Sequence, residues 1–218
     1  MKKVMALCMG MIVLTGCATS GPRQSSFLGE YGGKLSPAPE GGVAKMRWIK
    51  PGVDFTKYKK VMVDYVVFAL APDSEYNAIS GYEMKELGDA ASTALVTAVN
   101  QRRPVVAEPG PDVCRLRMAI VGLKQSRPIL SGVTTVIPAG MGISIIRKGV
   151  TGAWSGSGAT QAEAMVLDSV SNEVIAVGYL EYTAGFTERF TKWGSVQDAF
   201  DYWGKHGADG IEALVKLR

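Results

Sequence analysis

The sequence predicts an α+β fold: a mixed, mainly antiparallel sheet with two main helices packed on one face. Two observations lead to this fold class. Segments with the apolar spacing of strands alternate with two segments of helical spacing, in the order strand, helix, several strands, helix. Hydrophobic residues make up 47% of the chain, enough to bury a sizeable core.

The first strand and the first helix are predicted from residues 60–107. Residues 60–70 are dense in Val, Tyr and Phe, as in a largely buried strand. Ser80 can cap a helix that Pro104 stops, and a short strand at 105–107 follows. The apolar positions of this helix repeat every 3.6 residues and are Leu87, Ala91, Ala94, Leu95 and Ala98.

The second half of the chain predicts three strands and the final helix. A strand at 113–123 follows a turn at 109–112, and strands at 159–168 and 173–183 form a hairpin through residues 169–172. The final helix opens at 195–198 and has one apolar side, formed by Val196, Phe200, Trp203, Ile211, Leu214 and Val215.

Three glycines interrupt the pattern of the final helix, at Gly204, Gly207 and Gly210. Each costs a helix about 1 kcal/mol relative to Ala. We therefore expect either that the helix breaks there or that its backbone packs unusually close to the sheet.

The first residues predict a lipoprotein signal peptide over 1–16. Met1-Lys2-Lys3 is a positive start, and the apolar run 4–14 has the length of a signal-peptide core and is too short for a membrane span. The run ends in Leu14-Thr15-Gly16-Cys17, which resembles a bacterial lipobox and predicts lipid attachment at Cys17. An ordinary secretory leader with a buried Cys17 is the alternative.

Lipid anchoring sets the expected location and domain organisation. Acyl chains on Cys17 would fix the protein to a membrane, and Ala18 is not the acidic residue that retains enteric lipoproteins at the inner membrane. The expected location is the periplasmic side of the outer membrane. Residues 17–42 are rich in Ser, Gly and Pro and are expected to form a flexible tether to a single domain at 43–218.

Four short motifs carry a resemblance to a known family: 27–31 (FLGEY), 48–51 (WIKP), 58–61 (YKKV) and 162–169 (AEAMVLDS). With them the chain resembles the bacterial lipoprotein family catalogued as domain of unknown function 3313. The turn at 170–173 departs from the Thr-Gly-Glu form expected there. The resemblance implies an outer-membrane lipoprotein of Gram-negative bacteria and supplies no catalytic residues.

Composition argues against nucleic-acid binding and against a metal or cofactor site. Two of the 24 basic residues lie in the leader, so the rest of the chain has a net charge of +2 with its 20 acidic residues. His206 is the single histidine, and only Cys17 and Cys114 lie beyond the leader. We expect His206 to be solvated, Cys114 to be buried and unreactive, and no metal or cofactor to be bound.

The carboxylates give one weak candidate for chemistry. If Asp168 pairs with Glu173, Glu163 faces Gly178 on an apolar face, where burial would raise its pKa. Glu181 is then expected on the opposite face, so the two acids would not form a hydrolytic pair. We expect Glu163 and Asp64 to be structural acids.

Residues 129–150 are apolar throughout except for Arg147 and Lys148, and form the candidate interaction segment. Such a segment can contact a membrane or a second subunit, or it can cover the open face of the sheet. The residues of this segment that we expect to make the contacts are Ile129, Val136, Ile137, Met141, Ile143, Ile145 and Ile146.

The expected function is that of a non-enzymatic binding or assembly component of the cell envelope. Its expected partners are the membrane, through the lipid, and a protein of the envelope, with the oligomeric state left open. Two alternatives stand beside it: a self-associating lipoprotein whose apolar segment contacts the membrane, and an envelope hydrolase.

Overall fold

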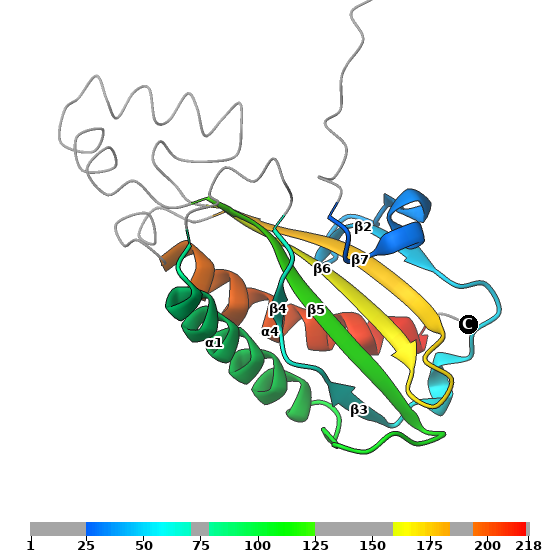
Figure 1. Cartoon of the computed structure of the whole chain (residues 1–218). Helices are drawn as coiled ribbons and strands as arrows, with labels where there is room; N and C mark the ends of the chain where they lie inside the picture. Colours follow the sequence, from blue (N-terminus) through cyan, green and yellow to red (C-terminus); the bar gives the residue numbers. More distant parts are fainter. Residues whose placement is uncertain (1–24, 71–78, 125–158, 184–193, 217–218) are drawn as a thin grey trace, which may run out of the picture.

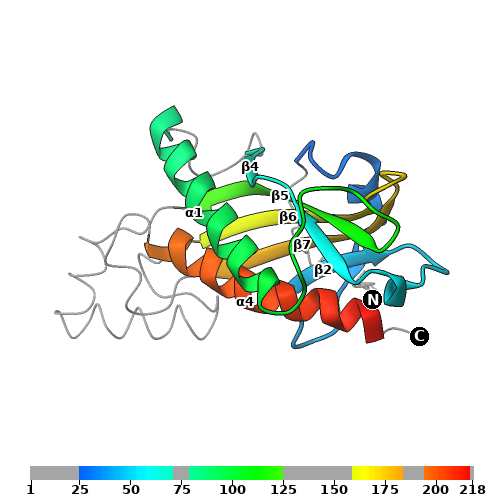
Figure 2. The same ribbon diagram turned by 90° about the horizontal axis from the view of Figure 1, so that it is seen from below.

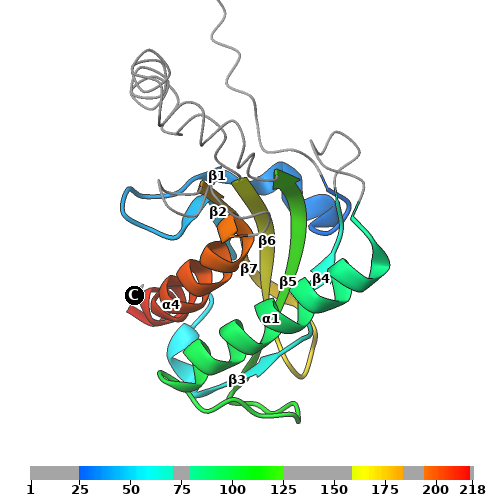
Figure 3. The same ribbon diagram turned by 90° about the vertical axis from the view of Figure 1, so that its left-hand side faces the viewer.

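Two helices cover one face of a seven-stranded sheet in the computed structural model, which describes residues 25–70, 79–124, 159–183 and 194–216 (Figure 1). The helices are α1 (Gly81–Asn100) and α4 (Gly194–Lys216). They pack against each other, with α1 over one edge of the sheet and α4 over β6 and β7 (Figure 3). The predicted fold class is confirmed.

The sheet is antiparallel except at one edge. Its main order is β1-β2-β7-β6-β5-β3, with β4 also paired to β5. Neighbours from β1 to β5 are antiparallel, whereas β3 and β4 run parallel to β5. The strand bounds are β1 Ser36–Pro37, β2 Ala44–Ile49, β3 Lys60–Val63, β4 Val67–Phe68, β5 Val113–Lys124, β6 Ala159–Asp168 and β7 Val174–Thr183.

The predicted strand at 60–70 is two short strands, β3 and β4. Between them Asp64 directs its carboxylate to Arg115, and the Val66 N–H donates to Ser92 Oγ of α1. The Asp64 N–H still donates to Leu116 O of β5, but the Val66 N–H bonds a side chain of α1 instead of a strand, so the ladder is interrupted there. The strand expected at 105–107 is reduced to a single bridge between Val61 and Val105.

Helix α1 begins where the sequence predicts. Ser80 Oγ accepts from the Glu83 N–H, and the Glu83 carboxylate accepts from the Ser80 N–H, so a capping box satisfies the first turn. The helix ends at Asn100, ahead of Pro104. Its buried side is formed by Leu87, Gly88, Ala91, Leu95 and Val99.

Helix α4 runs unbroken through its three glycines. A Cβ at Gly204 would lie 3.1 Å from Ala94 O and 3.3 Å from Ala98 Cβ. The close approach that the sequence led us to expect against the sheet therefore occurs at Gly204 against α1. That expectation is corrected, because the glycine allows the two helix backbones to approach.

The register of the β6–β7 hairpin differs from the expected one by a single residue. Glu163 pairs with Tyr179 and Gln161 with Glu181, because the ladder shifts between Val166 and Leu167. The Asp168 N–H still donates to Glu173 O at the turn. A one-residue bulge exchanges faces beyond it, so Glu163 and Glu181 share a face and the expectation that they lie on opposite faces was wrong.

The second face of the sheet is covered by residues 25–35. Leu28, 2% exposed, packs with Met165, Leu167 and Val177, and η1 (Gly29–Lys34) follows it. Residues 25–42 were expected to belong to a flexible tether. That expectation is corrected for this part, because Phe27, Leu28, Tyr31 and Leu35 supply apolar contacts to the sheet.

Candidate functional site

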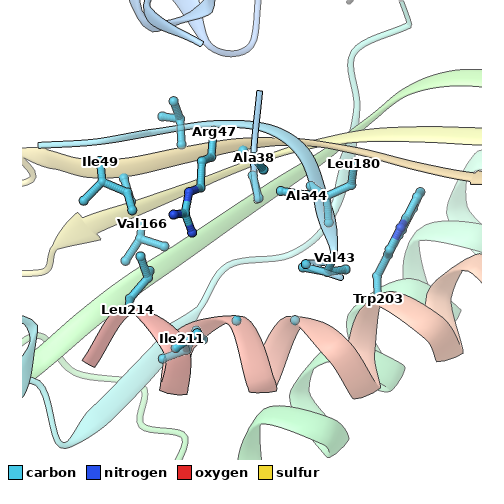
Figure 4. Close-up of a pocket in the computed structure, with 18 of the residues that line it drawn as sticks. Ala38, Val43, Ala44, Arg47, Ile49, Val166, Leu180, Trp203, Ile211 and Leu214 are labelled. Carbon is cyan, nitrogen blue, oxygen red and sulfur yellow. The ribbon is translucent and has the colours of Figure 1, made fainter. Parts of the chain in front are cut away.

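An apolar pocket of about 400 Å³ lies between α4 and the sheet (Figure 4). Strands β2, β7, β6 and β5 form its floor, α4 forms the opposite wall, and residues 38–43 form part of its rim. Figure 2 shows α1 and α4 side by side over the sheet, with α4 on the side of β7 and β2. The volume is in the range of pockets that hold small molecules.

Small residues on the sheet leave open space above the floor of the pocket. Arg47 of β2 pairs with Gly178 of β7, Gly178 with Ala164 of β6, and Ala164 with Met118 of β5. The centre of this cross-strand row thus carries no side chain larger than a methyl group.

The facing wall on α4 also contains residues without side chains. Gly207 and Gly210 lie on the stripe that otherwise presents Trp203, Ile211 and Leu214 to the sheet. A Cβ at Gly207 would meet nothing within 4 Å, and one at Gly210 would lie 3.6 Å from Val43 Cγ1. The pocket exists because the smallest residues face each other across the core.

Arg47 is the charged group inside this space. Its half-buried side chain points from β2 toward α4 (Figure 4). No hydrogen bond or ion pair joins its guanidinium to another residue that the structure describes. Glu40, the other ionisable residue of the lining, is exposed at the rim.

Trp203 lines the pocket with its indole ring. Its side chain is 2% exposed and rises from α4 toward the sheet (Figure 4). The indole Nε1 is buried and has no hydrogen-bond partner within the described ranges. Because this nitrogen is inaccessible to solvent, the indole N–H does not face the open space of the pocket.

Glu163 lies on the other face of the sheet, away from the pocket. It is 3% exposed and accepts hydrogen bonds from the Ser25 hydroxyl and from the backbone amides of Ser25 and Leu28. Burial raises its pKa, although these hydrogen bonds oppose the rise. Glu181, on the same face, accepts from Tyr179 Oη and Gln161 Nε2, each at 3.4 Å.

The other chemical candidates are also outside the pocket. His206 is partly exposed on α4, its ring is tilted by 49° against that of Tyr202 with 4.5 Å between centroids, and its Nδ1 lies 3.9 Å from Asp209 Oδ2. Cys114 is buried, and burial raises the pKa of its thiol to about 11. Asp64 is held by Arg115 through two hydrogen bonds of 2.8 Å. These positions agree with the sequence expectations.

Several predicted positions lie outside the described residues. They are the signal peptide, the lipid-attachment residue Cys17 and the candidate interaction segment at 129–150. Within the described ranges, no three His, Cys, Asp or Glu side chains gather as a metal site would require. None of the helices there has the length and apolarity of a bilayer span.

Sequence reasoning missed the pocket. The available signal was the pair Gly207 and Gly210 on an otherwise apolar helix stripe, together with Ala164 and Gly178 in the hairpin. Arg47 could not be placed, because the strand that carries it, β2, was not predicted.

Fold and pocket together define a class: a single-sheet α+β protein with a ligand-sized apolar cavity beneath its last helix. The family model described as protein of unknown function DUF3313 matches residues 23–206. The chain belongs to this family, as its motifs led us to expect.

Named relatives are lipoproteins. The uncharacterized lipoprotein YdcL of Escherichia coli K12 is 28% identical over 128 residues, which span 57% of this chain and 57% of that protein. The chain thus aligns with little more than half of the length of this relative. Its name supports a bacterial lipoprotein of the cell envelope.

Solved structures give only distant likenesses. The PelC dodecamer from Paraburkholderia phytofirmans is 8% identical with a TM-score of 0.39, over 73% of this chain and 96% of that chain. A putative lipoprotein from Caulobacter crescentus is 10% identical with a TM-score of 0.30, over 74% and 89% of the two chains.

Proposed function

We propose that this protein is a non-enzymatic binding lipoprotein, anchored through Cys17 on the periplasmic side of the outer membrane, which holds an apolar ligand in the pocket beneath α4. The observation that carries the proposal is the pocket itself. Small residues on β6, β7 and α4 keep it open, although larger apolar side chains at Gly178 or Gly207 would fill it and add buried contacts.

The chemistry of the lining supports binding over hydrolysis. The described residues that line the pocket comprise apolar side chains, glycines, Glu40 and Arg47, without a serine, threonine, cysteine or histidine nucleophile or base. The acid with a raised pKa, Glu163, faces the other side of the sheet. An envelope hydrolase would need its groups in the pocket, so this alternative is disfavoured.

The location follows from the lipobox and from Ala18 beside it. A protein partner in the envelope and self-association through 129–150 are separate proposals. Both are tested by cross-linking in cells that express the full chain, followed by pull-down and identification of the attached proteins.

Hydrogen exchange tests the binding function at the pocket itself. The full chain is purified from membranes and placed in lipid nanodiscs, and exchange is measured with and without dodecanol, an apolar chain without charge. We expect dodecanol to slow exchange in peptides covering 38–49 and 203–214, because these segments line the pocket. Exchange in the first turns of α1 should not change.

Two glycine substitutions make the test specific. Gly207→Leu should fill the pocket without a clash and abolish the protection, since a Cβ at Gly207 meets open space. Gly81→Leu adds the same side chain at the start of α1, also in open space, and should leave the protection intact. Equal protection in wild type and Gly207→Leu, or none in wild type, would refute the proposed function.

A further inference from the structure

Arg47 places a positive charge in the pocket, and no described residue forms a hydrogen bond or ion pair with its guanidinium. Arg47 is half-buried, and its neighbour across the ladder is Gly178, which leaves the guanidinium uncovered on the β7 side. Within the described ranges no acceptor engages it. A partly desolvated guanidinium without an anion is unfavourable, and its planar set of donors fits a carboxylate or phosphate.

Apart from the Arg47 guanidinium, the interior of the pocket is apolar. Leu116, Met118, Val166 and Leu180 from the sheet and Ile211 and Leu214 from α4 line the rest of the pocket. Such walls exclude a compact polar ligand, whose hydrogen bonds would go unsatisfied there. Glu40 is exposed at the rim, where water and salt screen its charge from an anion on Arg47.

Resting on the proposed function, we propose that the ligand is a single-chain amphiphile with an anionic head group, whose acyl chain lies between α4 and the sheet and whose head group binds Arg47. A free fatty acid and a lysophospholipid share this chemistry. Either head group would place an anion on Arg47, and the probes below distinguish the phosphate from the carboxylate.

Three probes with different head groups are compared in the same nanodisc hydrogen-exchange measurement. Lauroyl lysophosphatidate has a phosphate, dodecanoate has a carboxylate, and dodecanol has no anion. For each probe, the concentration that gives half-maximal protection of 203–214 is compared between variant and wild type. This ratio cancels the partition of the probe into the nanodisc lipid, because both proteins are placed in the same lipid.

Arg47→Gln should weaken the binding of lysophosphatidate and of dodecanoate roughly tenfold or more, since it removes a charge-assisted bond. The binding of dodecanol should not change. Arg47→Lys keeps the charge and should restore part of the affinity for both anions.

The outcomes distinguish this inference from the proposed function. If Arg47→Gln leaves the binding of both anionic probes unchanged while Gly207→Leu still abolishes protection by dodecanol, the pocket binds ligands but does not recognise an anionic head group. If Arg47→Gln weakens the binding of both anions, the anionic head group is supported, and if it weakens the binding of only one, that probe identifies the head group as phosphate or carboxylate. If no probe protects the pocket, the proposed function itself fails.

Discussion

Tyr58 Oη donates a hydrogen bond of 2.9 Å to Asp168 Oδ2, and so joins the segment before β3 to the turn of the β6–β7 hairpin. Lys57 Nζ reaches the same oxygen at 3.0 Å, and the backbone N–H groups of Val170 and Ser171 donate to Asp168 Oδ1. Burial alone would raise the pKa of Asp168, but these donors together hold it well below its ordinary value. Burial, followed by the bond to Asp168, raises the pKa of Tyr58 to about 12.

Asp168→Asn should therefore destabilise the domain at neutral pH by about 2 kcal/mol, because it removes a charge that several donors favour. A carboxylate with a lowered pKa stabilises the fold above the unfolded-state pKa, and this stabilisation is lost as pH falls toward the folded-state value. The difference between variant and wild type should shrink in acid. Urea unfolding across pH measures it, and a difference that does not depend on pH would contradict the assignment.

Glu163 should show the opposite pH dependence, since its folded-state pKa is raised. The stability that its protonated form contributes is full below the unfolded-state pKa and is lost as pH rises through the folded-state value. Glu163→Gln keeps an acceptor for Ser25, so its unfolding free energy should fall less over this range, by on the order of 1 kcal/mol. Glu108→Gln, an exposed site, is the control and should follow wild type.

The glycines of α4 should respond in opposite directions. Gly207→Ala should stabilise the protein by about 0.5–1 kcal/mol, because Ala favours a helix and the position is open. Gly204→Leu should destabilise it by about 2 kcal/mol, because its side chain would meet the Ala94 backbone. Thermal unfolding of both variants provides the comparison, and stabilisation by Gly204→Leu would show that α1 and α4 are not closely packed.

Cys114 should be unreactive in the folded protein, because burial keeps its thiol protonated at neutral pH. A maleimide should label Cys114 only after unfolding in urea, at a rate that follows the unfolding transition. Cys114→Ala should abolish this labelling. Rapid modification of the folded wild-type chain would contradict the buried position.

Lipid attachment should depend on Cys17. Cys17→Ser should abolish labelling by radioactive palmitate in growing cells and leave an uncleaved precursor. Cleavage at the same bond with continued partition into detergent would refute the lipobox assignment. Ala18→Asp should move the protein toward the inner membrane in an enteric host, as membrane fractionation would show.

Local signals predicted most of the fold. The Ser80 cap, the spacing from Leu87 to Ala98 and the strand at 113–123 depend on residues close together in the sequence, and the structure confirms each of them. The hairpin register was missed because the bulge between Val166 and Leu167 depends on how the whole ladder pairs. Strand β2 was missed although Lys45, Met46, Arg47 and Trp48 alternate as in a strand, because the segment is short and directly follows the Ser-, Gly- and Pro-rich stretch.

The pocket was missed for a related reason. Gly178 and Gly207 are far apart in the sequence, and each glycine by itself suggests a turn or a close backbone contact. Only the register across β2, β7 and β6 and the rotation of α4 bring the small residues opposite each other. A void is a property of two facing surfaces, and the pattern of either surface alone does not reveal it.

The packing of Leu28 against the sheet also fixes how far the protein can stand from the bilayer. With the lipid on Cys17, seven residues lie between the anchor and Ser25, where the described fold begins. The eight residue-to-residue steps from Cys17 to Ser25 cannot span more than about 30 Å even when fully extended, whereas a free tether to residue 43 would reach roughly 90 Å. The domain would therefore sit beside the headgroups, where an amphiphile leaving the membrane has only a short distance to travel to the pocket.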